Sequence, residues 1–223
     1  MTKQEIMDRF RQENPEITTR VISNSVLEAW AEVGELEIAT FTRCIRKKIS
    51  FTSIVDEDSY DLSAQEPLFF DIDEFPGGGI IYNNKRLVHT TFAILDEERA
   101  NWRSQSSGTP YDYVRFNESI MLGRKASSAQ TILAYLVVRS NAFNSNSAEP
   151  FNEFEHLLPF HYSIVLYLTK RAKGKIGKDK DVKSAMAEYA AYIKWMKSLI
   201  NRGIFNEIKM RPAFRNRGYR YRR

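Results

Sequence analysis

The stretch TILAYLVVRS, residues 131–140, decides how the rest of this chain can fold. Apolar residues occupy both alternating sets of positions in it, which predicts a strand that is covered on both faces. The sequence before this strand has an extended pattern that reaches back to Cys44, and a helical period returns after it. The chain therefore reads as a β region enclosed between two helical segments.

The β region is marked by its composition and its turns. KKISFTSIVDEDSYDL, residues 47–62, is rich in β-branched and aromatic residues and ends in turn formers. GIIYNNKRLV, residues 79–88, predicts a hairpin, because Asn83 and Asn84 can adopt the positive φ of a tight turn. LDEERANWRS (95–104) predicts a short helix, and SSGTPYDYVRFNESIMLG (106–123) predicts two strands around Asn117.

Helical spacing occurs on both sides of the β region. Before it, apolar residues three and four apart predict one helix face: Ile22, Val26, Ala29, Val33 and Leu36. After it, Pro159 fits the first turn of a helix that runs to about Ala172. A last long helix is predicted by the same spacing in Val182, Met186, Tyr189, Ile193, Met196 and Ile200, with Gly203 placed to end it.

These patterns predict an α+β fold. The N- and C-terminal helices should pack as a helical bundle, a discontinuous domain of residues 1–44 and 151–203, because neither set can bury its apolar face alone. An antiparallel β domain, residues 45–140, is inserted between them, and residues 141–150 return the chain to the bundle. Residues 204–223 form an extended basic C-terminal arm.

The charge of the chain is concentrated at this arm. The formal net charge is +5, but residues 201–223 contain eight lysines and arginines and one acid, Glu207. The rest of the chain is nearly neutral, so the basic charge bears on the partners of the arm and not on those of the body.

The single Cys44 excludes an intramolecular disulfide and a cysteine-based zinc site. Residues 1–10 lack the apolar core of a signal peptide and the apolar runs are too short for a membrane span, so we expect a soluble intracellular protein.

Candidate catalytic residues are few. Asp71 and Asp73 in DIDE could share a strand face and hold Mg²⁺, but an acidic strand end running into the turn FPGGG is the favoured interpretation. The loops PGGG (76–79) and GKIGK (174–178) lack the spacing of a phosphate-binding loop. The three histidines, His89, His156 and His161, are not spaced as metal ligands on a helix. We expect Cys44 to be a buried residue. We therefore expect no enzyme activity, no metal and no cofactor.

Two sets of residues suit contacts with other molecules. Trp30, Tyr189, Tyr192 and Trp195 fall on predicted amphipathic helices, where core packing is expected, although Tyr192 and Trp195 lie off the main apolar face. The arm MRPAFRNRGYRYRR (210–223) interleaves arginine with tyrosine and contains no acid. It could be a solvated end, but residues 204–223 can extend roughly 65 Å and order on a partner. The candidate binding residues are Arg211, Arg215, Arg217, Tyr219, Arg220, Tyr221, Arg222 and Arg223.

In order and local pattern the sequence resembles the head–tail connector adaptor (head-completion) proteins of tailed bacteriophages. The resembling segments are the helix after NPEITTR, DEDSYDL before FFDIDEF, GIIYNNKRLV, SGTPYDYVRF, TILAYLVVRS and the closing LLPFHYSIVLYLTKRAK…DVKSAMAEYAAYIKWMKSL. They span about residues 18–203. The chain has YDLS where the family has YDLP, and the basic arm is not part of the family pattern.

The resemblance implies a non-enzymatic virion protein of the head–tail neck, assembled in the host cytoplasm. About a dozen copies, twelve by expectation, would form a ring beneath the portal protein, complete the filled head and provide a seat for the tail or a second connector protein. DNA would pass through the ring lumen, and no membrane would be involved. The arm would dock on the portal or on a neighbouring copy. The alternative is a nucleic-acid-binding protein whose arm follows the phosphate backbone.

Overall fold

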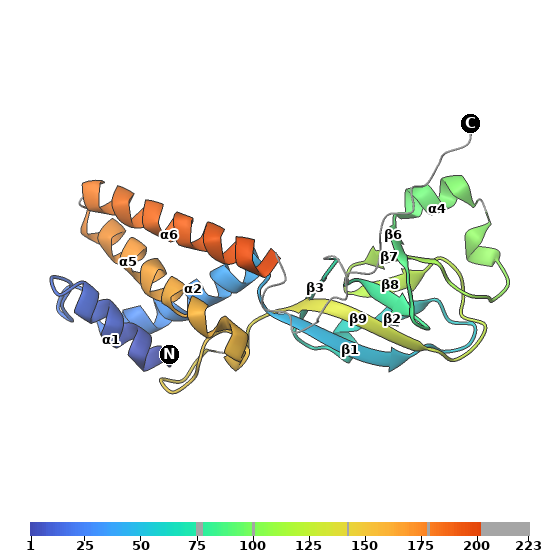
Figure 1. The fold of residues 1–223 in the computed structure, drawn as a ribbon, viewed down its shortest axis with the longest axis horizontal. Coiled ribbons are helices and arrows are strands. Elements are labelled where there is room, and N and C mark those ends of the chain that lie inside the picture. Colours follow the sequence, from blue (N-terminus) through green and yellow to red (C-terminus); the bar gives the residue numbers. More distant parts are fainter. Residues whose placement is uncertain (75–77, 100, 142, 178, 202–223) are drawn as a thin grey trace.

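The computed structural model describes residues 1–74, 78–99, 101–141, 143–177 and 179–201. Their structure is mixed α+β with antiparallel sheets, which confirms the predicted fold class. Figure 1 shows a helical lobe and a β lobe side by side. The helical lobe is built from both segments that flank the strands, so the β lobe is an insertion within it.

The helical lobe consists of α1 (Lys3–Glu13), α2 (Asn24–Thr42), α5 (Tyr162–Ile176) and α6 (Asp179–Asn201). α5 packs against each of the other three, so residues from both ends of the sequence share one core. The sequence patterns do not predict α1. It begins with a capping box, in which the side chains of Thr2 and Glu5 each accept a hydrogen bond from the other's backbone N–H.

The predicted buried face is correct for Ile22, which precedes α2 and is buried, and for Val26, which packs against the core, but it is wrong for the rest of α2. Its buried residues are Leu27, Ala31, Gly34, Glu35, Ile38, Ala39 and Thr42. Val33 and Leu36 are instead 48% and 49% exposed. The helix turns this way because Gly34 has no side chain: a Cβ there would overlap the ring of Tyr167 on α5. Gly34 and Glu35 are not apolar residues, so the apolar spacing did not reveal the face that contains them and indicated the face of Val33 and Leu36 instead.

The two C-terminal helices differ from the prediction near their beginnings. α5 begins at Tyr162, and Pro159 lies in the preceding 3₁₀ turn, Glu155–Phe160, which follows another at Phe151–Glu153. In α6 the predicted residues Ile193 and Met196 are buried, but Met186 is 52% exposed. Gly203 lies outside the described residues.

The first sheet is built around the stretch that decides the fold. Its order is β1-β9-β4-β5, and β3 also pairs with β9. The bounds are β1 Arg46–Thr52, β3 Phe69–Ile72, β4 Ile80–Tyr82, β5 Lys85–Arg86 and β9 Thr131–Val138. Ile132, Ala134 and Leu136 on one face of β9 are fully buried, whereas Leu133 and Tyr135 on the other are half-buried. β9 pairs with β1, β3 and β4, and the predicted cover is complete on one face and partial on the other, where Val137 is buried.

The second sheet has the order β2-β8-β7-β6. The bounds are β2 Ser59–Asp61, β6 Val88–Thr90, β7 Asp112–Phe116 and β8 Ser119–Leu122. β6 runs parallel to β7, which departs from the purely antiparallel expectation. α3 (Leu62–Gln65) follows β2, and α4 (Phe92–Glu98) with a 3₁₀ turn at Trp102–Ser104 supplies the short helix predicted there.

Turn chemistry is a dependable guide within these sheets. Asn83 and Asn84 have φ of 46° and 61° and join β4 to β5, as the hairpin prediction requires. Asn117, at φ 53°, joins β7 to β8.

One continuous hydrophobic core extends from Phe10 in the helical lobe to Leu136 in the β lobe, so the lobes are not independently packed bodies.

Candidate interaction site

All eight predicted binding residues of the arm lie outside the described residues. The structure does describe the place from which the arm starts, Asn201 at the end of α6. Two adjoining hollows lie there, and they share Phe41 and Lys197. The surface around Asn201 is therefore the candidate site.

The first hollow is a groove between α2 and α6, which we call the α2–α6 groove. It has a volume of about 390 Å³ and is lined by Glu37, Phe41, Tyr189, Ala190, Ile193, Lys194 and Lys197. Its floor is mostly apolar, although Phe41 is 60% exposed. The Lys197 ammonium lies 4.5 Å from the centre of the Phe41 ring, a cation–π contact that gives the groove a basic rim.

Two residues that line the groove, Glu37 and Tyr189, contact Lys170, which is not itself part of the lining. Its ammonium lies 4.0 Å from the centre of the Tyr189 ring and 3.8 Å from a carboxylate oxygen of Glu37. Burial lowers the pKa of Lys170, and the nearby Glu37 opposes this. Burial raises the pKa of Tyr189, so its hydroxyl stays neutral. The floor is suited to apolar side chains, with Lys194 and Lys197 left to meet negative charge.

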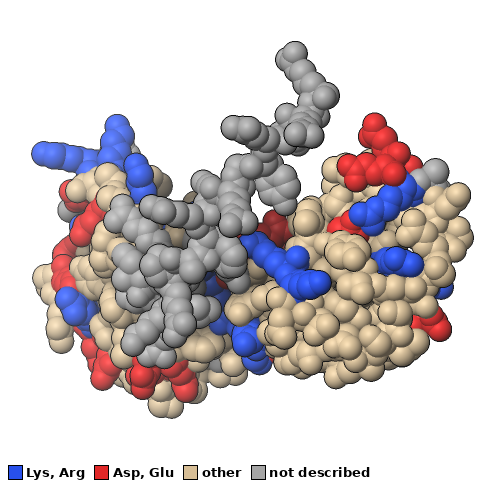
Figure 2. Space-filling model, turned by 45° about the vertical axis from the view of Figure 1, so that its right-hand side comes forward, with Lys and Arg blue, Asp and Glu red and all other residues tan. Residues whose placement is uncertain are grey.

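The second hollow, of about 510 Å³, lies where the two lobes meet. Its lining is Phe41, Thr42, Arg43, Arg46, Asp73, Glu74, Lys197 and Asn201. Figure 2 shows lysine and arginine side chains gathered between the lobes. This hollow is thus more polar than the α2–α6 groove beside it.

Asp71 and Asp73, the candidate magnesium ligands, are engaged by arginines. Asp71 forms ion pairs with Arg43, the residue that follows α2, and with Arg115 on β7. Asp73 pairs with Arg46 at 3.3 Å. Among the described residues no group of three potential metal ligands occurs. The arrangement joins the end of α2 to both sheets, which is the chemistry of a structural ion-pair network.

The histidines and Cys44 occupy separate places. His161 is buried and its Nδ1 lies 2.8 Å from the N-terminal amine; burial, reinforced by that positive charge, lowers its pKa to about 4. His89 pairs with Glu74 and stacks on Tyr113 in the β lobe. His156 packs beside Phe154. Burial raises the pKa of the Cys44 thiol to about 12, which leaves it protonated and unreactive.

The predicted aromatic residues pack mainly against the helical lobe itself. The Arg171 guanidinium lies over the Trp30 ring, 5.4 Å from the centre of that ring. Tyr192 donates a hydrogen bond of 2.7 Å to the carbonyl of Pro159. Trp195 meets Phe160 edge-on at 5.6 Å and remains 46% exposed. Of this set, Trp195 is the residue most available to another chain.

Sequence reasoning missed Glu35, a buried carboxylate. It accepts hydrogen bonds from the backbone N–H of Phe151, at 2.8 Å, and from the Ser140 hydroxyl. Burial raises the pKa of Glu35, and the two hydrogen bonds oppose that shift. The contacts fix the segment that returns from β9 to the helical lobe. Glu35 shares a helix face with Leu27, Ala31 and Ile38, and this was the signal that could have identified it.

No protein-family model matches this chain, and no curated protein matches its sequence. Among the residues that the structure describes, no helix has both the length and the apolar character needed to cross a membrane.

Proposed function

We propose that this chain is a head–tail connector adaptor: a structural virion protein that forms a ring beneath the portal, completes the DNA-filled head and provides the attachment site for the tail. Its place would be the head–tail neck of the virion, assembled in the host cytoplasm. The proposal starts from the resemblance of residues 18–203 to that family. Features of the described surface support it.

The observation that carries the proposal is the apolar stripe of α2, which consists of Ala29, Val33 and Leu36. The stripe has helical spacing, yet all three residues are exposed. An aligned apolar stripe on a helix is normally buried against another element. Because the stripe faces away from its own core, we assign it to a neighbouring copy in the ring.

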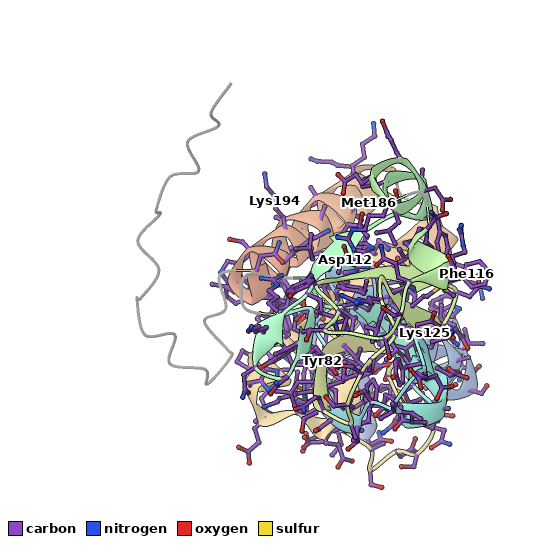
Figure 3. All side chains as sticks on the ribbon, turned by 90° about the vertical axis from the view of Figure 1, so that its right-hand side faces the viewer. Tyr82, Asp112, Phe116, Lys125, Met186 and Lys194 are labelled. Atoms are coloured by element: carbon purple, nitrogen blue, oxygen red, sulfur yellow. The ribbon has the colours of Figure 1, made fainter. Side chains whose placement is uncertain are left out.

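The β lobe offers further exposed apolar positions for a tail or a second connector protein. Val88, Tyr111 and Phe116 are all more than half exposed. Phe116 lies at the outer edge of the lobe in Figure 3. A protein whose two lobes both carry exposed apolar residues is suited to contacts on more than one side, as a ring component between head and tail requires.

The arm would dock on acidic residues of the portal protein through Arg215, Arg217, Tyr219, Arg220, Tyr221, Arg222 and Arg223, with Arg211 beside them. A single arm would bind weakly, but copies in a ring raise one another's effective concentration. Deleting residues 210–223 should leave the circular dichroism spectrum unchanged and abolish stable attachment to the portal. Normal attachment of the shortened chain would refute the role of the arm.

The strong positive charge of residues 201–223 favours nucleic-acid binding as a second candidate function. An arm that follows duplex DNA should lose affinity steeply with salt, with a log–log slope near 0.9 per phosphate neutralised. Fluorescence anisotropy on labelled duplex DNA measures this slope. Because a connector ring also surrounds DNA, stoichiometry and partner identity distinguish the two functions better than DNA contact alone.

The decisive experiment is affinity purification of the tagged protein from infected cells, followed by electron microscopy and mass spectrometry of what accompanies it. The connector proposal predicts rings stacked on a portal-like partner. Protein–nucleic-acid complexes without rings would contradict it and favour the second candidate.

A further inference from the structure

The α2–α6 groove lacks a cover among the described residues. Phe41 is 60% exposed, and Ala190, which also lines the groove, is exposed as well. Ile193 and Tyr189 complete an apolar floor. A groove with this lining suits an occupant that brings apolar side chains and some negative charge.

The chain itself continues from the edge of this groove. Asn201 lines the adjoining hollow, which shares Phe41 and Lys197 with the groove. The next residues are RGIFNEI, residues 202–208. This stretch contains three apolar residues, Ile204, Phe205 and Ile208, within five positions.

The segment has the length needed to run back along α6. From Asn201 to Ala190 the helix extends about 16 Å at 1.5 Å per residue. Five residues in extended conformation, 204–208, span about 17 Å. Gly203 can take the left-handed conformation that reverses a chain after a helix. A reversal there aligns the segment with the groove.

Charge supports the same occupant. Lys194 and Lys197 stand at the rim, and within the described part of the chain no acidic side chain pairs with either. Lys194 projects outward from α6 in Figure 3. Glu207 is the one acid among residues 202–223, which also carry eight lysines and arginines. Glu37, the acidic residue of the lining, lies beside Lys170, with 3.8 Å between its carboxylate oxygen and the Lys170 ammonium. The segment around Glu207 is therefore attracted to the rim lysines, and the cationic residues that follow are repelled by them.

We propose that residues 204–208 of the same chain occupy the α2–α6 groove, with Phe205 against Phe41 and Glu207 beside the rim lysines. The basic residues 209–223 then leave the helical lobe from a fixed point. The inference concerns the chain alone, so its failure would not affect the proposed function.

A disulfide tests the placement in the full chain. Ala190→Cys with Ile208→Cys should form an intrachain disulfide under mild oxidation, detected by mass spectrometry. Cys44 can remain, because its thiol is buried and has a pKa of about 12. The matched control is Ala191→Cys with Ile208→Cys, since Ala191 is an exposed neighbour outside the groove. The control should react at least about tenfold more slowly, a difference of about 1.4 kcal/mol. Equal rates, no disulfide, or a disulfide between two chains would overturn the proposal.

A double-mutant cycle gives a second readout without cysteines. Phe41→Ala and Phe205→Ala should each lower the melting temperature by about 2–4 °C. If the two rings pack together, the double variant should melt no lower than the less stable single variant. Strictly additive decreases, or no decrease from Phe205→Ala, would show that Phe205 does not occupy the groove.

Discussion

Glu35 shows how one buried side chain can hold distant segments together. Its carboxylate lies on α2 but accepts hydrogen bonds from Ser140 and from the backbone of Phe151, on the segment that leads back from the β lobe. A buried carboxylate is costly unless hydrogen bonds satisfy it. Here both donors would be left without this acceptor if the carboxylate were removed, which makes the residue structural.

Glu35→Ala should reduce the free energy of unfolding by about 2–3 kcal/mol, because it takes the acceptor from two donors in a buried site. Glu35→Gln, which keeps an acceptor oxygen, should cost less. Urea unfolding at pH 7 measures both, and Glu28→Gln on the same helix is the control. A loss of less than about 0.5 kcal/mol in the alanine variant would contradict this account, since that is the lower end of what one hydrogen bond contributes.

The same carboxylate makes stability depend on pH. Because burial raises its pKa in the folded state, the folded chain binds the proton more tightly than the unfolded chain does. Its contribution is favourable at low pH and is lost as the pH rises through the folded pKa. Glu35→Gln should therefore flatten the stability profile above the ordinary glutamate pKa, compared with the native chain. Urea unfolding across a pH series measures the two profiles, and parallel profiles would contradict the assignment.

At the scale of the elements, local chemistry could be predicted and tertiary contacts could not. The hairpin at Asn83 and Asn84 follows from turn geometry within four residues. The orientation of α2 depends on Tyr167, which lies more than a hundred residues away in the sequence. Apolar spacing alone indicated Val33 and Leu36 as core, and they proved to be surface. The arm remains a prediction, because its residues lie outside those described.

Gly34→Ala should destabilise the protein by about 1–3 kcal/mol, although alanine is the better helix former, because its Cβ would overlap the Tyr167 ring. The matched control is Gly174→Ala on α5. Apart from Gly174, its two chain neighbours and the backbone of its own helix, no atom lies within 4 Å of a Cβ built there, so this variant should gain about 0.5–1 kcal/mol. Thermal unfolding of the two variants measures both effects. Equal responses would show that Tyr167 can move aside.

At the scale of the whole molecule, the two lobes are joined by a shared core and by a charged network. Asp71 binds Arg43 at the end of α2 and Arg115 on β7, so a single carboxylate links the helical lobe to the second sheet. The Asp71 side chain is 17% exposed and that of Arg115 is 34% exposed, so their attraction is screened less than that of a surface pair, whereas the Arg43 side chain is 48% exposed. In the proposed ring, this linkage would keep the surfaces of the two lobes at a fixed spacing.

The apolar stripe of α2 gives the whole-molecule prediction. Val33→Asp with Leu36→Asp should abolish the proposed ring formation on the portal, because it places two charges in the proposed contact between copies. Both positions are exposed in the single chain, so its melting temperature should change by less than about 2 °C. Val33→Ile with Leu36→Met preserves the apolar character and should assemble normally. Electron microscopy counts the rings for each variant, and rings of normal abundance from the aspartate variant would place the contact between copies elsewhere on the molecule.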